Sequence, residues 1–233
     1  MMTKFDQKTL VFFLSADLLF VFLHIVLGFM VMKGWVSIWP DFFNIGRDWS
    51  AGEILNYIKW VLIIFTVMSI YLHRRVPVFL GLAIFFLIAL FDDSLQLHER
   101  GATWLIENTP MYDLFGTDQG VAGELVIWTF LGILSVSCLA IGWIMSPPEE
   151  CRRIVPVMLL FFGVVFCAVV LDVLHHKLPT PRSLFAGLLG ILEDGGEMVM
   201  LTFLLAYVRG GLKSAITDEQ VGLSSKLSVT GQS

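Results

Sequence analysis

Only 15% of the 233 residues are charged, whereas 57% are hydrophobic, and the formal net charge is −5. Soluble domains carry about 25% charged residues, so this composition excludes an ordinary soluble domain. No basic patch or nucleic-acid motif is found in the sequence, and we therefore expect no nucleic-acid partner. The three cysteines form no C-x-x-C pair and predict free thiols rather than a disulfide framework.

Apolar runs of about 20 residues recur along the chain, and each is long enough to cross a bilayer as an α-helix. They predict an all-α fold, one bundle of six transmembrane helices within residues 1–211, followed by a mobile polar tail at 212–233. The predicted spans are residues 9–32, 54–73, 76–99, 121–146, 153–176 and 184–208.

Lysine and arginine are distributed unevenly between the two sides that these spans define. Nine lie at the termini and even-numbered connections: Lys4, Lys8, Arg74, Arg75, Arg152, Arg153, Arg209, Lys213 and Lys226. Six are assigned to the opposite side: Lys33, Arg47, Lys59, Arg100, Lys177 and Arg182. The positive-inside rule then places both termini in the cytoplasm.

The first connection, residues 33–53, is rich in tryptophan and phenylalanine, which is typical of a segment at the membrane–water interface. It ends in Ser50-Ala-Gly-Glu53, a capping box that predicts the start of the second span. A short interfacial helix is expected at residues 101–107, after the third span.

Ionisable residues end the third span, where a purely apolar run meets Asp92, Asp93, His98 and Glu99. A charge in the hydrocarbon core costs roughly 3 kcal/mol even on the lenient insertion scale, so these groups need partners, water or a metal ion. The predicted topology brings groups from spans one, four, five and six, and none from span two, to the same membrane half. These are His24, Glu124, Asp172, His175, His176, Glu193, Asp194 and Glu197.

Helical spacing narrows this set. In a continuous third helix Asp92, Gln96 and Glu99 share one stripe, and His98 lies off it. We predict a metal centre in the outer half of the bilayer, formed by Asp92, Glu99, Glu124, Asp172, His175, His176, Glu193 and Glu197. His24, Asp93 and His98 are secondary candidates.

Two chemistries follow directly from these residues. Carboxylates outnumber histidines, and Asp172-x-x-His175 has the spacing found in dimetal four-helix bundles, so two iron or manganese ions are expected. Such a centre would serve an oxidoreductase acting on a lipid or a quinone. The alternative is a proton or cation pathway without bound metal, with Asp17 as its inner step. A purely structural use of some of these groups, as charges at helix ends, is the remaining alternative.

The same residues carry two family resemblances. Ser94-x-x-x-His98 resembles one motif of the intramembrane zinc hydrolases of the alkaline ceramidase type, which implies one zinc ion held by His98 with His175 or His176. The acidic pair before His98-Glu99, together with Trp49-Ser50-x-x-Glu53, resembles a set of uncharacterised bacterial polytopic membrane proteins. The second resemblance implies a bacterial inner membrane and no particular activity.

Overall fold

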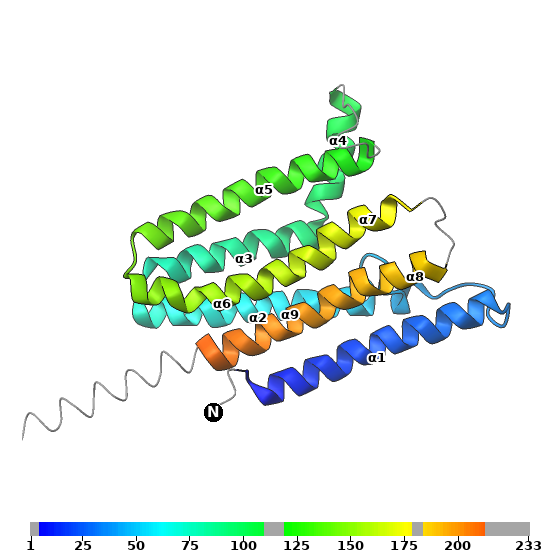
Figure 1. Ribbon diagram of the computed structural model, residues 1–233, viewed down its shortest axis with the longest axis horizontal. Helices are drawn as coiled ribbons and strands as arrows, with labels where there is room; N and C mark the ends of the chain where they lie inside the picture. Colours follow the sequence, from blue (N-terminus) through cyan, green and yellow to red (C-terminus); the bar gives the residue numbers. More distant parts are fainter. Residues whose placement is uncertain (1–4, 110–118, 179–183, 213–233) are drawn as a thin grey trace, which may run out of the picture.

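The computed structural model describes residues 5–109, 119–178 and 184–212, with the side chains of His176 and Leu184 excepted. This part of the chain is helical and contains no strand, which confirms the all-α prediction. The long helices lie side by side in one elongated bundle, whereas α4 points away from it (Figure 1). The α-helices are α1 (Gln7–Met32), α2 (Ala51–Arg74), α3 (Pro77–Leu95), α4 (Leu97–Asn108), α5 (Gln119–Ile144), α6 (Pro148–Val165), α7 (Asp172–His176), α8 (Leu184–Gly190) and α9 (Gly196–Tyr207).

Shorter helical turns complete the architecture. A 3-10 turn, η1 (Asp41–Phe43), lies in the connection between α1 and α2. Three stretches have the wider i→i+5 hydrogen bonding of a π-helix: η2 (Phe166–Leu171), η3 (Ile191–Gly195) and η4 (Val208–Leu212). They join α6 to α7, join α8 to α9 and extend α9, so residues 148–176 and 184–212 are each helical throughout. Insertions of this kind are frequent at functional sites.

Five helical segments among the described residues are long and apolar enough to cross a membrane. They are Gln7–Met32, Ala51–Arg74, Pro77–Leu95, Gln119–Ile144 and Pro148–His175. The last helical segment, residues 184–212, is not among them; it is divided by π turns and carries several charged residues. The composition and helix lengths therefore agree with a polytopic membrane protein.

Local sequence signals explain where the helices begin and end. The Asp6 side chain caps α1 by accepting from the Lys8 amide at 3.2 Å, and Pro77 and Pro148 occupy the first turns of α3 and α6. Arg75, in the left-handed conformation with φ 56°, ends α2. The Ser146 hydroxyl accepts from the Val78 amide at 2.8 Å and joins the start of α3 to the end of α5.

The apolar core lies between α2, α3, α6 and α9, in the part of the bundle away from α4. Its completely buried members are Ile63, Val67, Val78, Phe79, Leu82, Phe86, Ile154, Val157, Leu201, Leu204, Leu205 and Val208. Helices α3 and α5 approach closely at Gly81, where an added Cβ would lie 2.8 Å from the carbonyl oxygen of Cys138. The three cysteines are free thiols, as predicted.

The structure differs from the predicted spans chiefly at the third helix. It ends at Leu95 and not at residue 99, because Gln96 adopts the left-handed conformation with φ 53° and α4 starts at Leu97 in a new direction. The short helix expected at 101–107 is therefore longer and follows α3 directly. The predicted polar tail lies, from residue 213 on, outside the described residues.

Candidate functional site

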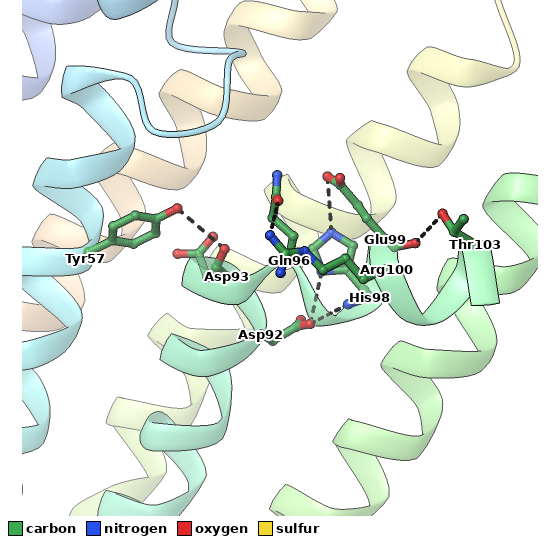
Figure 2. A network of polar contacts seen from close by, with 8 residues as sticks. All are labelled: Tyr57, Asp92, Asp93, Gln96, His98, Glu99, Arg100 and Thr103. Carbon is green, nitrogen blue, oxygen red and sulfur yellow. Dashed lines mark hydrogen bonds and ion pairs between the residues drawn. The ribbon is translucent and has the colours of Figure 1, made fainter. Parts of the chain in front are cut away.

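The break at Gln96 decides how the acidic segment is arranged. Because α3 and α4 are separate helices, Asp92, Gln96 and Glu99 do not share one helical stripe, and that prediction was wrong. The chain after Gln96 turns back on the end of α3, so that His98 lies over Asp92 (Figure 2). One carboxylate oxygen of Asp92 accepts from the His98 amide at 3.0 Å and lies 3.0 Å from its ring Nδ1.

His98 is held in place by these contacts and by an aromatic neighbour. Its ring packs on Trp128 of α5, with ring centroids 4.7 Å apart. Burial lowers the pKa of His98, but the hydrogen bond and the charge of Asp92 outweigh it and raise the pKa above its usual value. A fixed imidazole with a preference for the charged form therefore lies beside the acidic groups.

A cavity of about 320 Å³, here called the acidic chamber, lies next to His98 at the same end of the bundle. Nine carboxylates line it, and Arg47 and His98 are the basic residues of its lining. The carboxylates are Asp48, Glu53, Asp93, Glu99, Glu124, Asp172, Glu193, Asp194 and Glu197. They come from α2, α3, α4, α5, α7, η3, α9 and the connection before α2, so the chamber exists only in the assembled bundle.

Two carboxylates of the chamber, Asp194 and Glu197, are partly buried and line the cavity. The carboxylate of Glu197 lies near the like charges of Asp93 and Asp194 and near the opposite charge of Lys59. Within the described part of the chain neither Asp194 nor Glu197 takes part in a hydrogen bond or an ion pair, so two partly buried carboxylates line the cavity without such a partner.

Asp93 and Glu53, by contrast, have protein donors. The indole Nε1 of Trp60 donates to Asp93 at 3.2 Å, and the Tyr57 hydroxyl donates to the carbonyl oxygen of Asp93 at 3.5 Å (Figure 2). The Glu53 carboxylate accepts a short hydrogen bond from the Trp49 amide, while the Glu53 amide donates to the Ser50 hydroxyl at 3.3 Å. The predicted capping box therefore forms, with the amide of Trp49 in place of that of Ser50.

Two π segments place residues at the chamber. Asp172 directly follows η2, and η3 contains both Glu193 and Asp194. In a regular α-helix Asp194 would point about 100° away from Glu193. In the structure these residues lie in and next to the wider turn of η3, and Glu193, Asp194 and Glu197 all line one cavity.

A buried ion pair lies beneath the chamber. The Lys59 ammonium of α2 lies 2.6 Å from an oxygen of Asp17 of α1, and both side chains are 0% exposed. Lys59 also donates to Asn56 at 3.0 Å and to the carbonyl oxygen of Met198 at 2.9 Å, and Thr202 donates to Asp17 at 2.6 Å. Asn56 and Met198 belong to the chamber lining, so this network forms part of its floor.

Span two therefore does bring charged groups to the site, contrary to our expectation. Lys59 was assigned to a membrane face and Glu53 to a helix cap, although Lys59 is buried and Glu53 lines the chamber. Asp17, expected as an isolated inner proton site, is an ion-pair partner with a full set of donors.

Some of the residues predicted as metal ligands line the chamber in the structure, and others do not. Seven of them line the chamber: Asp93, His98, Glu99, Glu124, Asp172, Glu193 and Glu197. Asp92 is bonded to His98, and His175 is bonded through Nδ1 to Glu193 at 2.9 Å; neither belongs to the lining. His24 accepts from the Ile45 amide at 3.2 Å and packs on Trp39, so it holds the first connection against α1. The side chain of His176 lies outside the described residues.

Three lining carboxylates were absent from the predicted set: Asp48, Glu53 and Asp194. Asp48 precedes the capping box at the start of the second span and Glu53 is its last residue, and this position put both at the level of the other acidic groups. Among the described residues no three histidine, cysteine or carboxylate side chains are close enough together to hold a metal ion in the present geometry. The carboxylates surround the chamber without converging on one point.

A second cavity, of about 460 Å³, adjoins the chamber and is here called the apolar groove. The two cavities share nine lining residues: Asp48, Glu53, Asp93, His98, Glu99, Trp128, Ala168, Asp194 and Glu197. Away from this shared mouth the groove is lined mostly by apolar side chains of α2, α3, α5, α6 and η2, and its polar members there are Asp92, Gln96 and Ser135. The site thus combines a polar chamber with an apolar extension.

These features define, over the described residues, an all-helical protein with segments long and apolar enough to cross a membrane and with an acidic chamber between its helices. The chain belongs to a family described as a domain of unknown function, DUF8692, whose model matches residues 18–210. The match includes every residue of the acidic chamber and of the apolar groove. No curated protein and no solved structure matches the chain.

Proposed function

We propose that the protein is a membrane-embedded metalloprotein that holds divalent cations, two iron or two manganese ions, in the acidic chamber. The observation that carries this proposal is the pair of partly buried carboxylates, Asp194 and Glu197, that line the cavity and, in the described part of the chain, have no hydrogen-bond or ion-pair partner. Around them seven further carboxylates line the same 320 Å³. Like charges at this density repel one another strongly in a site shielded from bulk water, and bound cations relieve that repulsion.

The donor set favours hard cations. Carboxylate oxygens suit magnesium, calcium, manganese and iron, whereas zinc favours nitrogen and sulfur ligands. His98 is the one histidine of the lining, and His175 is already bonded to Glu193. The zinc hydrolase needs two imidazoles on one ion, so this arrangement supports it less well. The residues proposed as ligands are Asp93, Asp194, Glu197 and Glu53, and His98, Glu99, Glu124, Asp172 and Glu193 also line the chamber.

A transport pathway is also less well supported. Below the chamber the Lys59–Asp17 pair is fully bonded, and the next layers are the buried apolar core of α2, α3, α6 and α9. A proton or cation path needs polar groups or water at every level of the membrane. The chamber ends within the bundle, which suits a binding site better than a channel.

We further propose six spans, with residues 184–212 as the sixth, and both termini in the cytoplasm of a bacterial inner membrane. Asp6 and Ala206 are joined by a backbone hydrogen bond of 2.9 Å, so the start of α1 and the end of α9 lie at one end of the bundle. Arg209 pairs with Asp6 at that end. The positive-inside rule makes this the cytoplasmic end, and the chamber then lies in the outer half. The reaction class proposed for the centre is oxidation or reduction of a quinone or lipid supplied by the membrane.

The test is metal analysis of protein purified in detergent without added metal or chelator, by mass spectrometry of the elements. We expect about two iron or manganese ions per chain, as in other dimetal bundles. Glu197→Gln, which keeps the size of the side chain, should lose at least half of the metal. Glu149→Gln, an exposed glutamate at the start of α6, is the matched control and should keep it all.

The possible results separate the alternatives. One zinc ion per chain would favour the hydrolase. A metal-free wild type that takes up neither iron nor manganese on dialysis would refute the metal centre. Proton flux into liposomes that Asp17→Asn abolishes would favour transport instead.

A further inference from the structure

The apolar groove has a defined floor and two walls. Phe161 of α6 packs on Phe85 and Trp60, with ring centroids 4.7 and 6.2 Å away, and these rings close the floor. One wall is α5, from Trp128 to Val136, and the other is α6 with η2, from residue 158 to residue 169. Helix α5 packs mainly on α3 and α4, whereas α6 packs mainly on α9, so the two walls belong to different parts of the bundle.

The groove opens at an exposed apolar surface of the bundle. Phe162 and Val136, one on each wall, are 61% and 57% exposed. At its other end the groove reaches the carboxylates Asp93 and Glu197, which it shares with the chamber. A molecule in the groove therefore has hydrocarbon-like surroundings along most of its length and charged groups at one end.

The dimensions of the groove limit what fits in it. Its α5 wall covers eight residue steps and its α6 wall eleven, which correspond to about 12 and 17 Å at 1.5 Å per residue. A groove of this length, apolar along its walls and charged at one end, matches the shape and polarity of one amphiphilic chain.

We propose that the apolar groove binds the single hydrocarbon tail of an amphiphilic substrate, whose oxygen-bearing head group reaches the acidic chamber through the shared mouth. This inference rests on the proposed function, because the cations of the chamber are what would bind the oxygens of the head group. The substrate enters sideways from the bilayer, between α5 and the α6–η2 segment. Burial of each CH₂ group in the groove contributes affinity, so long-chain molecules bind better than short ones.

Gly132 is the position of α5 at which the groove can be filled without disturbing the fold. It lines the groove, and an added Cβ would meet no atom within 4 Å. A large side chain there projects into open space. Gly187 of α8 offers a matched control, since a Cβ there also meets nothing within 4 Å and the residue lines neither cavity.

The experiment is photolabelling of the purified, metal-loaded protein with a long-chain alcohol that carries a diazirine at mid-chain. We expect labels in residues 128–136 and 158–169, located by peptide mass spectrometry. An excess of unlabelled long-chain alcohol should remove them, and butanol should not. Gly132→Phe should lower this labelling by about tenfold or more, the effect of losing roughly 1.4 kcal/mol of binding free energy. Gly187→Phe should leave it unchanged.

Metal content and thermal stability, measured on the same samples, separate this inference from the proposed function. Gly132→Phe should keep the wild-type metal content. If the phenylalanine side chain lowers the melting temperature, the Gly132→Leu variant is used in its place. Saturable labelling of the groove in a wild-type protein that takes up neither iron nor manganese would support the groove and refute the metal centre. Labels spread evenly over the lipid-facing helices, labels unaffected by Gly132→Phe, or crosslinks between two copies of the chain would each overturn the inference.

Discussion

Replacing Lys59 by methionine, an uncharged side chain of similar length, will leave the carboxylate of Asp17 buried without its cation. Lys59 has three acceptors in the folded protein: Asp17, Asn56 and the carbonyl oxygen of Met198. In the variant Asp17 keeps its hydrogen bond from Thr202 and loses its ion pair. Because both side chains are 0% exposed, no water from outside the bundle can replace the ammonium group.

The expected loss follows from this geometry. Removing one partner of a buried pair costs about 3–5 kcal/mol, whereas replacing both partners by apolar groups is often nearly neutral. Lys59→Met and Asp17→Leu should therefore each lower the free energy of unfolding by about 3–5 kcal/mol, and the double variant by much less than their sum. Lys33→Met, at an exposed helix end, should change it by less than about 0.5 kcal/mol.

The assay is unfolding in mixed micelles by SDS titration, followed by far-ultraviolet circular dichroism. A double-mutant cycle over the four proteins gives the coupling energy between the two positions, and we expect at least about 3 kcal/mol. Losses that simply add in the double variant, or single variants that cost less than about 1 kcal/mol, would refute the buried pair as a stabilising element of the chamber floor.

Two further predictions concern the ends and contacts of the helices. The Thr9 hydroxyl donates to Asp6 at 2.7 Å and lowers the pKa of the Asp6 carboxyl. The stability that Asp6 contributes is therefore present above about pH 4, and it is lost as the pH falls through this lowered pKa. Asp6→Ala should lower the free energy of unfolding by about 1 kcal/mol at pH 7 and by less at pH 3. Asp6→Asn is the control, because asparagine keeps a capping side chain. An equal loss of stability in Asp6→Ala at both pH values would contradict the assignment. Gly81→Ala should cost about 1–3 kcal/mol, because the new Cβ would lie 2.8 Å from the carbonyl oxygen of Cys138 and push α3 and α5 apart, whereas Gly187→Ala should be neutral or slightly stabilising. Equal melting temperatures for the two glycine variants would refute the close contact.

The composition and the apolar runs determined the helical membrane architecture without any tertiary information. A stretch of about 20 apolar residues can satisfy its backbone in a bilayer only as a helix, so its length and composition are enough to identify it. The capping box at Ser50–Glu53 marked the start of α2, and the predicted start of the third span at residue 76 lies one residue from the start of α3 at Pro77. The concentration of acidic residues at one level could also be read from the positions of the spans.

The sequence could not show which of these residues face one another. Helical periodicity assumes an unbroken α-helix, and this assumption fails at Gln96 and at the π segments η2 and η3. The break turns His98 back onto Asp92 and into the chamber lining, and η3 accompanies the placement of Asp194 beside Glu197. Lys59 and Asp17 are 42 residues apart, so their pairing depends on how α1 and α2 pack. Local residue patterns predict which segments are helices and how deep their charges lie; only the packing of those helices decides which charges meet, because each contact joins residues that are distant in the sequence.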